Sequence, residues 1–160
     1  MVSLRNINTL LVFDPKSEKI KFYSVGRFLR QHDPDFMPGD KISVLDNRNL
    51  FSSDGSESLS SRILEIDVKD GSAKVVLQGK GANNFFTRIM GVHQRLENGN
   101  ILLASSIEGR VIEYAPDGTI VWYYHNRFTN NQNARVFMAK LLPLHMDAEF
   151  FKKCRSTLYE

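Results

Sequence analysis

Residues 30–47, which read RQHDPDFMPGDKISVLDN, decide the fold because they contain a complete β-hairpin with a charged run in front of it. The Pro-Gly-Asp turn at residues 38–40 separates a strand that ends at Phe36 from a second strand that ends at Asn47. Pro, Gly and Asp favour tight turns, and alternation of apolar and polar residues is typical of strands. The same stretch carries His32, the histidine whose position best suits chemistry.

A second copy of this hairpin follows later in the chain. Residues 96–103 read LENGNILL, and their Asn98-Gly99 pair is a strong signal for a two-residue hairpin turn. This hairpin therefore repeats in the sequence, at residues 37–44 and again about sixty residues later at 96–103.

A second type of hairpin occurs three times: before, between and after these two copies. It begins at Thr9, Arg62 and Arg110, and each copy is a strand, a tight turn and a second strand. Because the two hairpin types alternate, one period holds four short strands over about fifty residues, which is typical of a β-propeller blade. A generic meander or a sandwich is the alternative, and the fixed alternation of the two hairpins favours the propeller.

The sequence therefore predicts an all-β chain that is a partial β-propeller, with about two and a half four-stranded antiparallel blades. Its short last segment has the composition of a helix. Propellers usually close with four to eight blades, so either several copies share one ring or this chain lacks N-terminal blades. The predicted domain spans residues 1–146 and is followed by a tail at 147–160; it is divided into a half blade at 8–25, blades at 29–78 and 92–125, and an extra strand at 134–142.

Composition excludes several classes of function. The net charge of +3 is small and the basic residues are dispersed, so we expect no nucleic-acid partner. No stretch approaches the ~20 apolar residues of a membrane helix, and these residues show no signal peptide, so we expect no membrane partner. A single cysteine, Cys154, excludes an internal disulfide.

Several segments, taken in order, resemble the bacterial arylsulfate sulfotransferase (arylsulfotransferase) family. The resemblance extends over about residues 27–142, and it departs from the family pattern at Arg48, where a glycine is usual, and at the turn 38–40, where Asn-Gly is usual. The matching segments are residues 30–33, 42–47, 61–67, 86–91, 94–102 and 109–123.

This resemblance implies a propeller around a central channel and transfer of a sulfuryl group from a phenol ester to another phenol, without a nucleotide donor. The family's histidine nucleophile lies in a Gln-His motif before an Asp-Asn strand end, and His32 occupies that position here. The implied partners are a phenolic sulfate ester and a phenol acceptor, with no cofactor. Family members are longer, are commonly periplasmic, and carry further active-site histidines and an arginine on earlier blades.

The chemistry of sulfuryl transfer assigns roles to residues near His32. Imidazole is neutral near pH 7 and can leave again, so it suits a covalent intermediate. Arg30 and Arg62 are the candidate donors to the charged sulfuryl oxygens, because a guanidinium donates two parallel hydrogen bonds. Gln31 and Asn47 complete the expected substrate-binding group by orienting the ring or the donor.

Each of these residues also has a plainer interpretation. His32 is equally typical of a polar residue at a strand start that binds a turn. Arg62 suits an ion pair with Glu65 or the end of a strand, and His93 is expected to be structural. The aromatic residues 122–124 suit packing between blades better than a ligand platform.

No metal site is expected from the sequence. Asp33 and Asp35 offer two carboxylates, whereas calcium takes six to eight oxygens. Asp14, Asp67 and Asp117 are expected to form turns through side-chain hydrogen bonds.

Two hypotheses of different classes thus follow from the sequence. The first is an arylsulfotransferase-like enzyme that acts through a sulfo-histidine and is active when other blades complete the site. The second is a non-catalytic repeat module that binds partners through its blade faces. The segment 30–33 favours the first, and the small number of blades favours the second.

Overall fold

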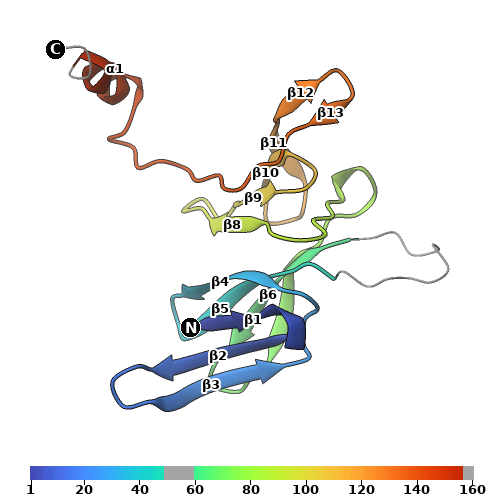
Figure 1. The fold of residues 1–160 in the computed structure, drawn as a ribbon, viewed down its shortest axis with the longest axis vertical. Coiled ribbons are helices and arrows are strands. Elements are labelled where there is room, and N and C mark those ends of the chain that lie inside the picture. The colour runs from blue at the N-terminus through green and yellow to red at the C-terminus, as the bar shows by residue number, and fades with distance from the viewer. Residues whose placement is uncertain (49–59, 157–160) are drawn as a thin grey trace.

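The structure is a computed structural model that describes residues 1–48 and 60–156. Residues 49–59 and 157–160, which belong to the predicted blade 29–78 and the predicted tail, lie outside the described part. Most of the described strands form three antiparallel sheets of three or four strands, one after another along the chain (Figure 1), and a fourth, two-stranded sheet follows them. Sheet one holds β1 (Val2–Leu4), β2 (Thr9–Asp14) and β3 (Lys19–Val25); sheet two holds β4 (His32–Met37), β5 (Lys41–Asp46), β6 (Arg62–Asp67) and β7 (Ala73–Leu77); sheet three holds β8 (Val92–Arg95), β9 (Ile101–Ser105), β10 (Arg110–Tyr114) and β11 (Ile120–His125).

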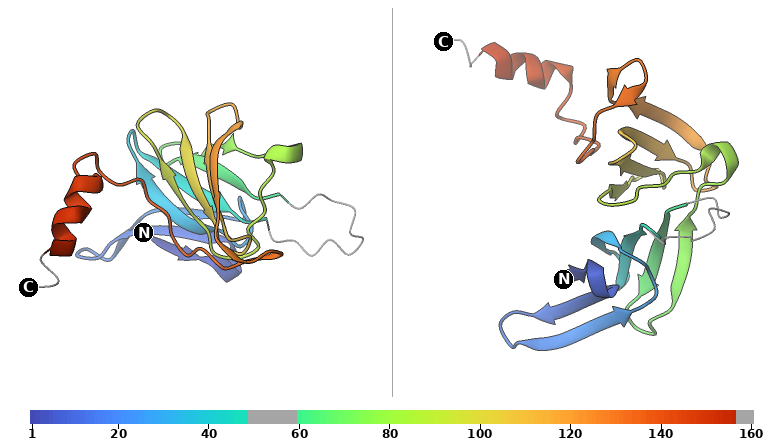
Figure 2. Two further views of the ribbon diagram at one scale, coloured as in Figure 1. Left: turned by 90° about the horizontal axis from the view of Figure 1, so that it is seen from above. Right: turned by 45° about the vertical axis from the view of Figure 1, so that its right-hand side comes forward.

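Each sheet is an antiparallel meander in which consecutive strands pair. The first strands of the three sheets are neighbours, because β4 contacts both β1 and β8. The sheets follow one another in an open arc (Figure 2), as successive blades of a propeller do. The chain is therefore mostly β and forms an incomplete set of propeller-like blades, as predicted.

Smaller elements complete the described chain. A two-stranded hairpin of β12 (Arg127–Thr129) and β13 (Gln132–Asn133) follows sheet three, and α1 (Ala148–Ser156) confirms the predicted short helix. Two 3-10 turns span Arg5–Ile7 and Gly81–Asn83. In the described ranges, no helix has the length and apolar character that a membrane crossing requires.

Short-range hydrogen bonds form the turns between outer strands. The Asp14, Asp67 and Asp117 carboxylates accept the amide N–H two residues later at 2.9, 2.8 and 2.9 Å, as predicted. These bonds favour the charged carboxylate, so the backbone N–H of Lys16 lowers the pKa of Asp14, and that of Thr119 lowers the pKa of Asp117.

Two apolar layers hold the three sheets together. The strand β5 contributes to both layers, because its successive side chains point to opposite faces of sheet two. Val44 lies between sheets one and two, and Leu45 lies between sheets two and three. The first layer contains Leu10, Phe28, Ile42, Val44, Leu64 and Ile66, and the second contains Leu45, Ile63, Leu77, Phe85, Ile101, Leu103, Ile112 and Tyr114.

The structure differs from the predicted blades in two places. The predicted half blade 8–25 has a third strand, because Val2–Leu4 pairs with β2. The predicted strand 134–142 is wrong, since these residues are not in a strand and pair with none of the described strands. The Val136 amide donates to the Ser106 carbonyl and the Leu141 amide to the Gln94 side chain, so no continuous ladder forms. An apolar run becomes a strand only where an edge is available to pair with it.

Candidate functional site

A β-bulge at the start of β4 positions the candidate site. His32 pairs with Leu45 and Asp35 pairs with Ser43, so Asp33 and Pro34 stand opposite the single residue between those partners. Asp33 has a positive φ of 50°, a conformation that aspartate tolerates better than most residues. Proline lacks an amide N–H and is therefore accommodated at a bulge.

The bulge determines which face of sheet two the site occupies. In a regular strand, residues three apart point to opposite faces. The extra residue instead places His32 and Asp35 on the face of Leu45 and Ser43, which is turned toward sheet three. Bulges commonly redirect side chains in this way next to functional sites.

Both nitrogens of the half-buried His32 ring have partners. Nδ1 lies 2.7 Å from Asn47 Oδ1, and the Met90 amide N–H donates to Nε2 at 3.4 Å. Met90 itself has a positive φ of 61°, in a turn that leads into β8. The histidine thus contacts the end of its own hairpin and the entrance of the next blade.

Asn47 determines the tautomer of the neutral His32 ring. Its Nδ2 group donates to the carbonyls of Thr87 at 2.7 Å and Met90 at 2.9 Å, so its Oδ1 must face the imidazole. An amide oxygen only accepts hydrogen bonds, and therefore the proton of neutral His32 resides on Nδ1. Nε2 keeps its lone pair, which a nucleophile requires.

Gly91 allows the turn to approach the site closely. A Cβ atom there would lie 2.5 Å from Leu45 Cδ2 and 3.0 Å from Thr87 Cγ2, and the residue has a φ of 96°. Its amide N–H donates to the Ser106 hydroxyl at 3.0 Å. Glycine is the residue that fits this combination of positive φ and close contact.

Arg30 and Gln31 face sheet one instead of the His32 ring. The Arg30 guanidinium donates to Asn6 Oδ1 at 2.9 Å at an exposed position. Gln31 is fully buried, and its Nε2 donates to Ser3 Oγ at 3.1 Å and to the Thr9 carbonyl at 3.0 Å. The structure therefore brings Asn47 to His32 but directs these two neighbours elsewhere.

Arg62 is held by a buried carboxylate. Its Nε atom lies 2.8 Å from Asp46 Oδ2, and Asp46 also accepts the amide N–H of Leu29 at 2.8 Å. The Asp46 side chain is 1% exposed, which makes this pair a support for the hairpin that carries His32 and Asn47. The sequence suggested Glu65 as its ion partner, and Asp46 takes that place.

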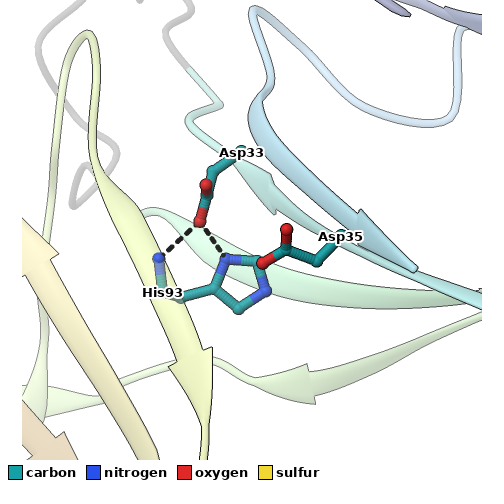
Figure 3. Close-up of side chains that lie close together, drawn as sticks. All are labelled: Asp33, Asp35 and His93. Atoms are coloured by element: carbon teal, nitrogen blue, oxygen red, sulfur yellow. Dashed lines mark hydrogen bonds and ion pairs between the residues drawn. The ribbon is translucent and has the colours of Figure 1, made fainter. Parts of the chain in front are cut away.

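A second polar group on the same face was missed by sequence reasoning. Asp33 and Asp35 of β4 lie beside His93 of β8 (Figure 3). Asp33 Oδ2 accepts the His93 amide N–H at 2.5 Å and lies 2.9 Å from His93 Nδ1. His93 Nε2 lies 2.6 Å from Ser43 Oγ. The residues come from different blades, so no local motif could have indicated their proximity.

The two carboxylates of this group lie close enough to repel each other. Asp35 is exposed by surface area, but partial desolvation, followed by the neighbouring Asp33 carboxylate, raises its pKa above the ordinary value of 3.8. Two carboxylates that share a site resist simultaneous ionisation. A cation between them would relieve this repulsion.

A cavity of about 370 Å³ lies elsewhere, on the outer side of the blades. It is lined by β7 and by the turn at residues 116–118, and His32 is not part of it. The polar contacts around His32 therefore lie away from this cavity.

The profile of the arylsulfotransferase (ASST) family matches residues 1–127. This chain belongs to the arylsulfotransferase family. The match covers all three sheets, including His32, Asn47 and the turn at Met90, and ends within β12. A search of curated proteins found no significant match.

Membership of the arylsulfotransferase family confirms the resemblance and shifts its limits. The matched range begins before residue 27, the start of the resemblance seen in the sequence, and ends before residue 142. It includes sheet one, and it leaves the residues after Arg127, the helix α1 among them, outside the arylsulfotransferase region.

Proposed function

We propose that this chain transfers a sulfuryl group from an aryl sulfate ester to a phenol through a covalent sulfo-histidine at His32. The observation that supports this most directly is the hydrogen bond between His32 Nδ1 and Asn47 Oδ1. It leaves Nε2 unprotonated and holds the ring in one orientation. Positioning of this kind lowers the entropic cost of the reaction.

In the first half-reaction, the Nε2 lone pair attacks the sulfur atom of the donor ester. The N–S bond forms, the bond between sulfur and the aryl oxygen breaks, and the phenolate takes a proton from solvent as it leaves. The imidazole becomes a positively charged ring with a sulfuryl group on Nε2 and a proton on Nδ1. Asn47 Oδ1 accepts that proton's hydrogen bond and stabilises the charge.

In the second half-reaction, the acceptor phenol loses its proton and its oxygen attacks the same sulfur. The N–S bond breaks, and the electron pair returns to Nε2 of neutral His32. The sum is one ester and one phenol consumed and one ester and one phenol formed, with no oxidation or reduction. A covalent intermediate of this type predicts ping-pong kinetics.

The sulfuryl oxygens require donors, and the chain offers candidates. The Met90 amide N–H donates to Nε2 at 3.4 Å, and it passes to a sulfuryl oxygen when the sulfur takes the Nε2 lone pair. Arg30 remains our candidate guanidinium, because its contact with Asn6 is exposed and a side-chain rotation breaks one hydrogen bond. For Arg62 and Gln31 we propose supporting roles, since the first holds Asp46 and the second binds sheet one.

Completion of the site by further blades is part of this proposal. His32 begins the first strand of sheet two, and the described sheets form an open arc (Figure 2). We propose that other copies of the chain, or further blades, surround the phenolic sulfate ester and the phenol acceptor and supply the remaining cationic groups.

The test is an assay with a chromogenic aryl sulfate as donor and an unsubstituted phenol as acceptor. We expect release of the chromogenic phenol, parallel double-reciprocal plots and sulfate label on the protein. In His32→Ala all three should fall to background, whereas His125→Ala, which changes a histidine at the end of β11, should retain them. Phenol release that is absent, or unaffected by His32→Ala, would remove the enzyme proposal for this chain.

A binding module is the second candidate, and one observation favours it. Residues Val121, Trp122, Tyr123 and Tyr124 of β11 are 53%, 49%, 62% and 49% exposed. An exposed apolar run of this size on one strand is typical of a contact surface. Binding through this strand without His32-dependent transfer would favour the module.

A further inference from the structure

We propose that Asp33, Asp35 and His93 bind one divalent first-row transition ion at the junction of sheets two and three. One ligand atom from each residue lies within 4.8 Å of the others (Figure 3). This site is separate from His32 chemistry and does not depend on the proposed transfer.

The spacing of these atoms suits an ion. Metal–nitrogen and metal–oxygen bonds of about 2.0–2.2 Å place neighbouring ligand atoms roughly 3–4 Å apart. Asp33 Oδ2 and His93 Nδ1 lie 2.9 Å apart, and the full set spans no more than 4.8 Å. Small side-chain rotations at Asp35, which is exposed, would complete the geometry.

The buried imidazole of His93 adds a third candidate ligand to the two carboxylates. The His93 side chain is 1% exposed, and its Nδ1 atom lies 2.9 Å from Asp33 Oδ2 but makes no hydrogen bond to any described residue. Its other nitrogen lies 2.6 Å from Ser43 Oγ. If Nε2–H donates to that hydroxyl, Nδ1 presents a lone pair toward the carboxylates, and the serine acts as the outer partner that metal-ligating histidines usually have.

The donor set indicates the class of ion. One imidazole and two carboxylates are typical ligands of ions from manganese to zinc, whereas magnesium and calcium favour oxygen donors alone. The Asp33 carboxyl is 20% exposed and Asp35 is open to solvent, so an ion can enter from the surface.

The bound ion would link two blades. Asp33 and Asp35 belong to β4 and His93 to β8, so coordination stabilises the contact between sheets two and three. Any ligand that binds only the folded state raises its stability.

Calorimetric titration of the metal-free full chain with Zn²⁺ tests the proposal, with Mn²⁺ paramagnetic resonance as a second measurement. We expect one site per chain that Asp35→Asn weakens at least tenfold, while Asp40→Asn leaves it unchanged. Asp40 is a matched exposed aspartate on the same hairpin, paired with Lys69. At a Zn²⁺ concentration a hundredfold above Kd, the melting temperature should rise by roughly 5–10 °C.

Asp35 is the decisive position because its substitution leaves the buried contacts of His93 intact. His93→Gln should also abolish the site, and its folding is checked first by circular dichroism. Binding that persists in Asp35→Asn, or the absence of saturable binding in the full chain, would overturn the proposal. Retained binding in His32→Ala would separate this site from the transfer reaction.

Discussion

The Asn47 carboxamide hydrogen-bonds both to the loop before β8 and to His32, so one side chain stabilises the fold and positions the site. Both of its N–H groups are used by carbonyls of the loop before β8, and its oxygen faces His32. A buried amide with all its partners in place is stable, but each partner left unpaired costs free energy. The positioning of His32 is thus coupled to the folding of the loop at residues 87–90.

We predict that Asn47→Ala lowers the free energy of unfolding by about 2–4 kcal/mol, because the buried Thr87 carbonyl and the half-buried Met90 carbonyl lose the donor that Asn47 supplies. Urea denaturation followed by fluorescence measures this loss. The control is Asn131→Ala, at an exposed position between β12 and β13, which should change stability by less than about 0.5 kcal/mol. Equal stabilities for the two variants would contradict the role of Asn47.

Elements from neighbouring blades are joined by one charged residue as well as by apolar packing. Glu65 of β6 lies 3.1 Å from Lys41 and 3.0 Å from Lys74, and 3.6 Å from Arg95 of β8. Burial alone would raise the pKa of Glu65, but hydrogen bonds from Lys74 and Lys41 outweigh it and lower the pKa. This carboxylate therefore stabilises the folded chain when it is charged.

The direction of the pKa shift predicts a pH dependence. The unfolded value is 4.5 and the folded value is lower, so the stabilisation is present above pH 4.5 and is lost as pH falls through the folded pKa. We expect Glu65→Gln to lower the free energy of unfolding by about 1 kcal/mol at pH 7 and to approach wild-type stability at low pH.

Denaturant titrations between pH 3 and pH 7 measure the difference between Glu65→Gln and wild type. Glu97→Gln, at an exposed turn position between β8 and β9, is the control and should stay within about 0.5 kcal/mol of wild type. A deficit for Glu65→Gln that stays constant over this range would contradict the assignment.

The whole molecule is an open arc of sheets (Figure 2), and its first and last sheets expose apolar side chains. Tyr23 and Val25 of sheet one are 65% and 61% exposed, and Trp122 and Tyr124 of sheet three are both 49% exposed. Monomeric proteins rarely leave large apolar patches uncovered. In a closed ring, faces of this kind pack against neighbouring blades.

We predict that the chain self-associates, so that sedimentation gives a mass above 18.3 kDa that rises with concentration. The double substitution Trp122→Ser and Tyr124→Ser should shift the mass toward the monomer. Phe128→Ser, which removes a 77% exposed aromatic side chain from β12, is the control and should leave the association unchanged. A monomer at all concentrations would contradict this prediction.

Local interactions explain which predictions from the sequence succeeded. The turns at Asp14, Asp67 and Asp117 followed from side chains that bind the backbone two residues away. The two four-stranded antiparallel sheets followed from alternating strands and from Asn-Gly or Asp-Gly turns. Contacts of this range are encoded within a few neighbouring residues, and sequence patterns report them directly.

The sequence by itself determined the blades, the family resemblance and the position of His32 and Asn47 on one hairpin. Only the tertiary structure decided that residues 134–142 form no strand and that His93 meets Asp33 and Asp35. The β4 bulge and the packing of sheet three on sheet two bring those residues together across sixty positions. The physical reason is that pairing edges and sheet faces exist only once distant strands have packed, so no local pattern contains them.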